Sequence, residues 1–314
     1  MKEGRASRTA EYMALFRALE AVRLPGRRVF EDRFAAAFLS PRLRRVVNLS
    51  KVPVVGALIR AYVDHRWPGA RTSAVARTRF IDDEAGVALG SGTEQVVILG
   101  AGFDARAYRI AAMGRVPVFE VDHPSTSAAK RTIVQAMLAS VPHHVRFVPV
   151  DFNSEPLQDK MSAAGYDPLR CTLFIWEGVT NYLTESAVDE TLRWCAGAAA
   201  GSTVVFTYVH RLVLDAPQAF YGTEKLFMTL SAAGERWTFG LDPSQLPSFL
   251  AQRGLVLSED VGASDYRARY LGRAAMRVRG YEFYRIAVAR VPGPPLTPNA
   301  AQPQVAAAGA PHRR

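Results

Sequence analysis

The chain of 314 residues carries a formal net charge of +10, with 49% hydrophobic and 22% charged residues. This composition is that of a globular protein, and no apolar run reaches the roughly 18 residues of a membrane-spanning helix, so we expect no membrane partner. The arginines that supply the positive charge are scattered along the chain, which argues against a nucleic-acid partner.

The two cysteines, Cys171 and Cys195, are too few for a disulfide framework or a metal site. Both lie in apolar stretches, and we expect both to be buried packing residues. The N-terminus lacks the apolar core of a signal peptide. Together these features predict a cytoplasmic protein without a metal.

The first 90 residues are predicted to be largely helical. Apolar spacing predicts helices over 7–22, 32–39, 43–62 with a break near Pro53, and 71–89. Because a Rossmann dehydrogenase commonly opens on its glycine-rich strand, this long extension favours a different arrangement. We predict that residues 1–90 form a helical N-terminal cap.

From residue 91 onward strands and helices alternate, which is typical of a parallel sheet. Strands are expected at 96–99, 116–121, 145–150, 172–176, 203–209, 255–258 and 281–290, and helices at 105–110, 125–140, 157–164, 186–200 and 243–253. We predict an α/β core over 91–290, in which the aromatic-rich segment 210–245 forms a lid. Residues 291–314, rich in Pro, Ala, Gly and Gln, are expected to be a disordered tail.

The first predicted strand, residues 96–99, runs directly into Gly100-Ala101-Gly102. A continuous aliphatic run indicates a strand that is buried on both faces. The two glycines permit a tight turn and a close approach to a ligand. Strand, turn and helix together match the nucleotide-binding unit of a doubly wound α/β fold, although a glycine turn that binds nothing is the alternative.

Acidic residues end the next three predicted strands. Glu120 and Asp122 follow the glycines by about 20 residues, where an acid can accept hydrogen bonds from ribose hydroxyls. Asp151 follows the third strand and could reach an adenine amine, with Phe152 packed on the ring, and Glu177 ends the fourth strand. Each acid alone is equally well explained as a helix cap or a solvated group. Together they predict an adenosine-containing ligand.

Two features favour S-adenosylmethionine over NAD, although the glycine turn also fits the dinucleotide pattern. Asp104 in the turn would repel a pyrophosphate, whereas acids here and at Glu177 suit a sulfonium and an ammonium group. The cofactor carboxylate needs a cation, and Arg77 or Arg79 in the preceding helix could supply it.

Eight segments carry a resemblance to a known family: 7–10, 30–32, 76–83, 99–106, 119–124, 150–152, 176–183 and 280–285. They resemble the leucine carboxyl methyltransferase family. The resemblance is closer to its bacterial branch of S-adenosylmethionine-dependent methyltransferases, which includes polyketide carboxyl O-methyltransferases similar to the tetracenomycin carboxyl methylase. The resemblance extends from about residue 7 to residue 290.

The resemblance implies a class I methyltransferase fold, a Rossmann-like α/β sheet of seven mostly parallel strands with a helical N-terminal cap. It also implies a set of cofactor-binding residues. These are Arg77 for the methionine carboxylate, Gly100 and Gly102 for the backbone contact, Asp122 for ribose with Glu120 beside it, Asp151 and Phe152 around adenine, and Glu177 for the amine. Phe152 stands where the family usually has leucine, and Arg8 is a weak candidate for a basic cofactor contact near the N-terminus.

The sequence defines the methyl acceptor less clearly than the cofactor. A carboxylate is already ionised at neutral pH, whereas a phenol or alcohol needs a general base. Tyr182, Tyr208 and His210 follow or end strands on the expected substrate side, and His210 or Tyr208 is the candidate base. His210 is explained as well by a solvated strand end. If the substrate is an acid, Arg211 or Arg285 could bind it.

We therefore expect an S-adenosylmethionine-dependent O-methyltransferase that acts on a carboxyl group of a small molecule, as in polyketide or other secondary metabolism. The alternatives are a methyltransferase for phenolic hydroxyls, a catalytically silent protein that binds the cofactor, and an NAD-dependent oxidoreductase.

Overall fold

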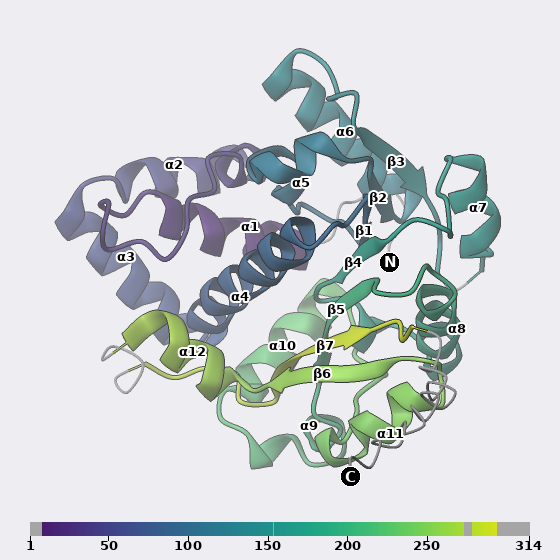
Figure 1. Cartoon of the computed structure of the whole chain (residues 1–314). Helices are drawn as coiled ribbons and strands as arrows, with labels where there is room; N and C mark the ends of the chain where they lie inside the picture. Colours follow the sequence, from purple (N-terminus) through teal and green to yellow (C-terminus); the bar gives the residue numbers. More distant parts are fainter. Residues whose placement is uncertain (1–7, 153, 273–277, 294–314) are drawn as a thin grey trace, which may run out of the picture.

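A seven-stranded sheet forms the centre of the computed structural model, which describes residues 8–152, 154–272 and 278–293 (Figure 1). The strands are β1 (Gln95–Leu99), β2 (Val118–Asp122), β3 (Val145–Pro149), β4 (Thr172–Trp176), β5 (Thr203–Val209), β6 (Val256–Val261) and β7 (Tyr284–Arg290). Their order is β3-β2-β1-β4-β5-β7-β6, and β7 runs antiparallel to both of its neighbours. The predicted fold class is confirmed.

The strand order reverses between β1 and β4. From β1 the chain adds β2 and β3 on one side, then crosses over to add β4 and β5 on the other. Ligands of doubly wound folds bind beyond the carboxyl ends of the strands at such a reversal. The glycine turn after β1 and Glu177 after β4 lie at this point of the sheet.

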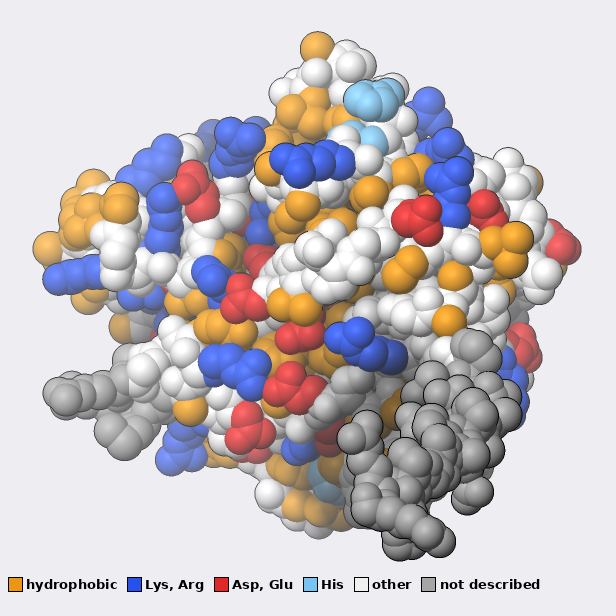
Figure 2. All heavy atoms as spheres, viewed as in Figure 1, with side chains coloured by type: hydrophobic (Ala, Val, Ile, Leu, Met, Phe, Trp, Pro, Cys, Tyr) orange, Lys and Arg blue, Asp and Glu red, His pale blue; other side chains and the backbone are white. Residues whose placement is uncertain are grey.

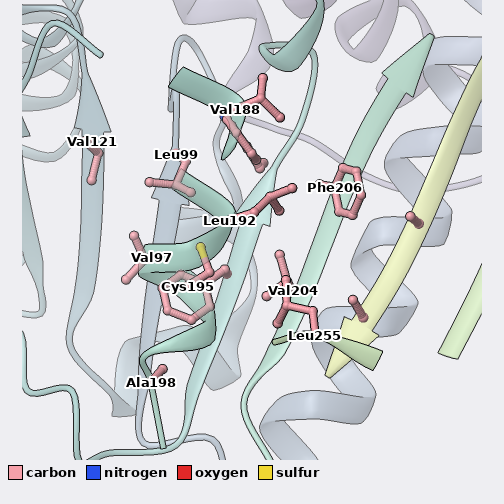
Figure 3. Packing of buried hydrophobic residues seen from close by; sticks show 14 of the residues in the cluster. Val97, Leu99, Val121, Val188, Leu192, Cys195, Ala198, Val204, Phe206 and Leu255 are labelled. Atoms are coloured by element: carbon pink, nitrogen blue, oxygen red, sulfur yellow. The ribbon is translucent and has the colours of Figure 1, made fainter. Parts of the chain in front are cut away.

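Helices cover both faces of the sheet. The bounds of those nearest to it are α4 (Ala70–Gly90), α5 (Arg106–Arg109), α6 (Pro124–Leu138), α7 (Leu157–Ala163), α8 (Glu185–Ala196), α11 (Leu246–Ala251) and α12 (Ala263–Leu271). Figure 3 shows Val97 and Leu99 of β1 beside side chains of α8. Val96 and Ile98 belong instead to the cluster formed with α4 and α12. Because both faces of β1 are covered, its sequence is aliphatic at successive positions.

The N-terminal residues form a separate helical layer. It contains α1 (Arg8–Ala21), η1 (Ala35–Phe38), α2 (Pro41–Leu49) and α3 (Pro53–Arg66). Its buried side chains pack in one cluster with Phe103 of the glycine turn and Trp237 of the later lid segment. The predicted helix over 43–62 is therefore two helices, and Pro53 opens the second, since the first turn of a helix tolerates a missing N–H. α4, which the predicted cap includes, packs on the sheet.

The segment 210–245 contains α9 (Leu212–Asp215), η4 (Pro217–Ala219) and α10 (Thr223–Ala233), and it ends at η5 (Pro243–Gln245). Leu241 then bridges back to His210 beside the sheet. α10 and α12 were not predicted as helices. The helix predicted over 105–110 is only the short α5, which continues into η2 (Ala111–Arg115).

Several further predictions have different outcomes. Cys195 is buried, but Cys171 is only half-buried, so the prediction for Cys171 was wrong. The final strand begins at Tyr284, three residues later than predicted, because residues 281–283 form a turn. Most of the predicted tail, residues 294–314, lies outside the described residues. Among the helices of the described ranges, none has the length and apolar character that crossing a bilayer requires.

Candidate functional site

A cavity of about 530 Å³ opens at the carboxyl edge of the sheet, within the size range of small-molecule sites. Residues from α1, α4, the strand ends and the lid segment line it. Seven of the eight predicted cofactor residues are among them: Arg77, Gly100, Gly102, Asp122, Asp151, Phe152 and Glu177. The fold thus brings to one cavity predicted cofactor residues that are up to 100 positions apart in the sequence.

The glycine turn is fixed by its neighbours on both sides. Gly100 has φ +64°, and a Cβ there would lie 2.2 Å from Cγ2 of Val179, so any other residue would clash. The Asp122 carboxylate accepts hydrogen bonds from the backbone N–H of Gly102 and from that of His123, the latter at 2.7 Å. Burial raises the pKa of Asp122 although these donors oppose the shift. Asp122 therefore holds the turn from the neighbouring strand while it faces the cavity.

Glu120 does not line the cavity, contrary to its predicted place beside the cofactor. Its side chain is 1% exposed and lies 2.9 Å from Lys130 Nζ of α6. The Tyr108 hydroxyl donates to it at 2.9 Å. Glu120 lies two residues before Asp122 on the same strand face, one step deeper under the sheet edge, so it forms a buried ion pair instead of a ligand contact.

Two arginines hold the carboxylate of Glu177. Arg77 Nε lies 2.8 Å from Glu177 Oε1, and Arg106 Nη1 lies 2.8 Å from Glu177 Oε2. Burial alone would raise the pKa of Glu177, but the charges of Arg106 and Arg77 outweigh it and lower the pKa to about 2. Arg77 also lies over the Tyr284 ring, 4.4 Å from its centroid. Glu177 is therefore ionised at every physiological pH.

Arg106 was not predicted as a site residue. It is 2% exposed, and besides Glu177 it pairs with Asp104 and with Asp82 at 2.8 Å. Burial opposes ionisation of Asp104, but Arg106 holds its pKa well below the usual range. The prediction treated Asp104 and Glu177 as free acids opposite the cofactor's cations. In the structure Arg106 neutralises part of that charge, and the local sequence Asp104-Ala105-Arg106 was the available signal.

The lid side of the cavity is aromatic and apolar. Tyr182 lines it and meets the Trp237 ring edge-on, with the ring centroids 6.4 Å apart. Leu226 and Leu230 of α10 and Tyr281 complete this wall. Burial raises the pKa of Tyr182 and that of Tyr281, so both phenols stay protonated at neutral pH.

Tyr208 and His210 lie outside the cavity lining, so the structure does not bring the two candidate bases to the site. The Tyr208 hydroxyl donates to Asp260 Oδ1 at 2.9 Å and accepts from Arg285 Nε at 3.0 Å, in the layer where β5 meets β7 and β6. His210 Nδ1 accepts from the backbone N–H of Leu212, the first residue of α9, at 3.1 Å. Both side chains have structural partners.

The two arginines predicted to bind an acidic substrate lie outside the cavity lining. Arg211 pairs with Asp215 and Arg285 pairs with Asp260, both away from the cavity lining. Three arginines do line the cavity among the described residues. Arg17 pairs with Asp32 and Arg77 pairs with Glu177. The third, Arg236, is exposed and makes no ion pair within the described ranges. Nothing in the sequence around Arg236 indicated that it would line the cavity.

The family model described as leucine carboxyl methyltransferase matches residues 10–196. The chain belongs to the leucine carboxyl methyltransferase family. It is an S-adenosylmethionine-dependent methyltransferase, which confirms the predicted enzyme class and cofactor. The match extends from α1 through α8, so it includes the glycine turn and the ends of β2, β3 and β4. The lid segment lies beyond the matched residues.

Relatives and a solved structure agree with this assignment. A Frankia alni protein named "Putative S-adenosyl-L-methionine-dependent methyltransferase" is 36% identical over 208 residues, which are 66% of this chain and 70% of that protein. A Streptomyces coelicolor protein of the same description is 39% identical over 145 residues, which are 46% of this chain and 50% of that protein. The methyltransferase chain thus matches about half to 70% of these relatives' length.

A crystal structure titled as a putative methyltransferase from Thermobifida fusca superimposes with a TM-score of 0.55 at 18% identity. The superposition covers 93% of this methyltransferase and 97% of that chain. At this identity the likeness shows a shared fold.

Proposed function

We propose that this methyltransferase transfers a methyl group from S-adenosylmethionine to a carboxylate of a small, largely apolar acid. The observation that carries the proposal is Arg236, the cavity-lining cation without an acidic partner among the described residues, beside the aromatic wall of Tyr182 and Trp237. The resemblance of the motifs to polyketide carboxyl methyltransferases supports a place in secondary metabolism, and we place the reaction in the cytoplasm.

The donor groups at the sheet edge fit the cofactor. Asp122 offers a carboxylate for ribose hydroxyls, and Phe152 beside Asp151 offers an apolar wall and a carboxylate for adenine. Arg77 and Glu177 lie side by side as a cation and an anion, the complement of an amino-acid carboxylate and ammonium. We assign these residues, with Gly100 and Gly102 at the turn, to the cofactor. When bound, the cofactor supplies an electrophilic methyl group on a sulfonium.

The chain's own residues then have to bind and align the acceptor. Arg236 would bind the acceptor carboxylate, and Tyr182, Trp237, Leu226 and Leu230 would pack against its apolar body. Holding an acceptor in line with a methyl group removes much of the entropy cost of the reaction. A carboxylate needs no proton removed, which agrees with raised pKa values of the phenols Tyr182 and Tyr281.

The proposal is tested with matched acceptors. Aromatic carboxylic acids and the corresponding phenols are assayed for transfer of a labelled methyl group by the purified enzyme, and S-adenosylhomocysteine binding is measured by calorimetry. We expect acids to be methylated and phenols not. Arg236→Gln should raise KM for an acid by about 10- to 100-fold, the value of one charge-assisted hydrogen bond, with unchanged S-adenosylhomocysteine affinity.

Two variants serve as controls. Arg211→Gln removes an exposed arginine outside the cavity and should behave as wild type. Asp122→Asn should instead weaken S-adenosylhomocysteine binding, which separates the cofactor side from the acceptor side. Methylation of phenols but not acids, or an unchanged KM in Arg236→Gln, contradicts the proposed acceptor.

A further inference from the structure

Helix α3 carries apolar side chains on its outer side. Val54, Leu58 and Tyr62, spaced four residues apart, are 71%, 66% and 67% exposed. Arg60 and Asp64 on the same helix are only half-buried and turn toward the protein. The inner side of α3 is apolar as well, with Val63 buried and Ile59 packed on the helical layer, whereas the outer side of a surface helix is normally polar. The orientation of α3 therefore calls for a contact outside the chain.

The connection between α2 and α3 extends this stripe. Leu49 and Val52 are 60% and 54% exposed, and with Val54, Leu58 and Tyr62 they make up what we call the α2–α3 apolar patch. It holds five of the twelve large hydrophobic residues that are exposed in the described ranges, within 14 positions of the sequence. Figure 2 shows hydrophobic side chains gathered at the left end of the molecule, over α2 and α3 of Figure 1. Contiguous exposed apolar surface of this kind marks interaction sites.

Unpaired positive charge surrounds the patch. Residues 41–66 contain six arginines and lysines and one acid, Asp64, whose carboxylate is bound by Arg71. Arg42, Arg45 and Lys51 are exposed and have no acidic partner within the described residues. A second copy of the chain would bring these like charges together, which disfavours a symmetric dimer through this surface. A partner that complements this surface would therefore have an apolar interior and an anionic surface.

We propose that the α2–α3 apolar patch docks on an anionic lipid bilayer. The outward stripe of α3 would enter the boundary between headgroups and acyl chains, and Arg42, Arg45 and Lys51 would lie at the lipid phosphates. This is peripheral binding, in agreement with the finding that the helices of the described ranges do not meet the requirements of a bilayer span. It departs from the sequence-based expectation of no membrane partner, which rested only on the lack of a long apolar run.

The C-terminal end of α3, beside the patch, contacts α10 of the segment 210–245. Trp67, directly after α3, lies 5.3 Å from the Tyr12 ring of α1 by ring centroids. Its indole Nε1 donates to Thr229 Oγ1 of α10 at 3.4 Å, and Lys225 Nζ of α10 donates to the His65 carbonyl at 3.3 Å. A bilayer bound at α3 would therefore lie next to the helix that borders the cavity.

Co-sedimentation with lipid vesicles tests the proposal on the full chain. Vesicles of phosphatidylcholine alone are compared with vesicles that also contain phosphatidylglycerol. We expect binding to the anionic vesicles that weakens with added salt. Val54→Ser with Leu58→Ser should reduce the binding constant by at least about tenfold through lost apolar burial. Arg42→Gln with Arg45→Gln should reduce it by about thirtyfold through lost charge.

Matched substitutions elsewhere on the surface control for general effects. Leu169→Ser and Arg170→Gln change an exposed leucine and an exposed arginine outside the patch and should bind as wild type. All six positions are exposed, and circular dichroism melting verifies that each variant is folded. Absence of binding to anionic vesicles, equal binding to neutral ones, or wild-type binding by the patch variants overturns the proposal. A dimer in light scattering that Val54→Ser with Leu58→Ser converts to monomer would overturn it in favour of self-association.

Discussion

At the scale of single residues, Arg106 determines the electrostatics of the cofactor site. It is almost fully buried and contacts Asp104, Asp82 and Glu177. A buried guanidinium with several hydrogen-bonded carboxylates recovers its desolvation cost, whereas removal of one partner leaves an uncompensated charge. The carboxylate of Glu177 is therefore presented to the cavity in a fixed position and in its ionised form.

This arrangement predicts a specific pH dependence of stability. Glu177→Gln should lower the free energy of unfolding at pH 7 by about 3 kcal/mol, because the pKa of Glu177 lies near 2 in the folded state against a usual 4.5. A depressed carboxyl pKa stabilises the fold above the unfolded-state value. The difference between the two proteins should accordingly be full above about pH 5 and shrink as pH falls toward 2.

Urea unfolding followed by circular dichroism at several pH values checks this prediction. Glu185→Gln, in the first turn of the neighbouring helix α8, is the control, since that side chain is exposed. A stability difference that is constant across the acid range would show that Glu177 contributes through packing and not through its charge.

The sequence located site residues where a simple periodicity places them. Acids at the ends of parallel strands meet at one edge, which is why Asp122, Asp151 and Glu177 were found together. The sequence does not show how far below that edge a side chain lies. Glu120 was therefore predicted to lie beside the cofactor together with Asp122. Tyr208 and His210 were predicted on the substrate side for a related reason. Their hydrogen-bond partners come from later elements of the chain, β6, β7 and α9, which the sequence pattern at these two residues does not reveal.

At the scale of elements, α1 and the segment 210–245 meet at the cavity. Thr9 Oγ1 donates to Glu235 Oε2 at 2.5 Å, and the two residues are 226 positions apart. Both residues line the cavity, as do Ala10 and Met13 of α1. α1 is thus joined to the segment 210–245 by a hydrogen bond between two residues that line the cavity.

We predict that Thr9→Val loosens this closure. Loss of one hydrogen bond of about 1 kcal/mol should speed dissociation of S-adenosylhomocysteine by about fivefold, with an unfolding temperature close to that of wild type. Stopped-flow displacement of the bound product measures the rate. Thr132→Val, which changes an exposed threonine on α6, should have no effect. An unchanged rate in Thr9→Val would mean that the lid opens without breaking this contact.

Secondary structure was predictable wherever the local pattern agreed with the final packing. β4 and β5 have the predicted bounds because each is a fully buried run of mostly apolar residues. α12 was missed because its nine residues mix polar and apolar side chains and its buried face is narrow, with Ala263, Tyr266 and Arg267 inside. α5 is shorter than predicted, and its first residue, the buried Arg106, bonds to acids of other segments, which no local pattern shows.

At the scale of the whole molecule, the order of strands in the sheet differs from their order in the chain. β7 lies between β5 and β6, and it pairs along the full length of β5 from Thr203 to Val209. β5 is fully buried in the finished fold, with phenylalanine, tyrosine and valine among its residues.

During protein synthesis β5 is made well before β7, its neighbour in the sheet. A ribosome that has made β1 through β5 still has to make the lid, β6 and α12 before β7 exists, and throughout that time the apolar edge of β5 has no neighbour. Unpaired apolar edges of this kind promote aggregation. We expect ribosome-bound chains arrested before Tyr284 to be cleaved by protease within β5, and chains arrested after Arg290 has left the exit tunnel to resist cleavage there. Resistance in the shorter chains would mean that other segments shield β5 first. We thus expect β5 to stay unprotected in the nascent chain until β7 has been synthesised.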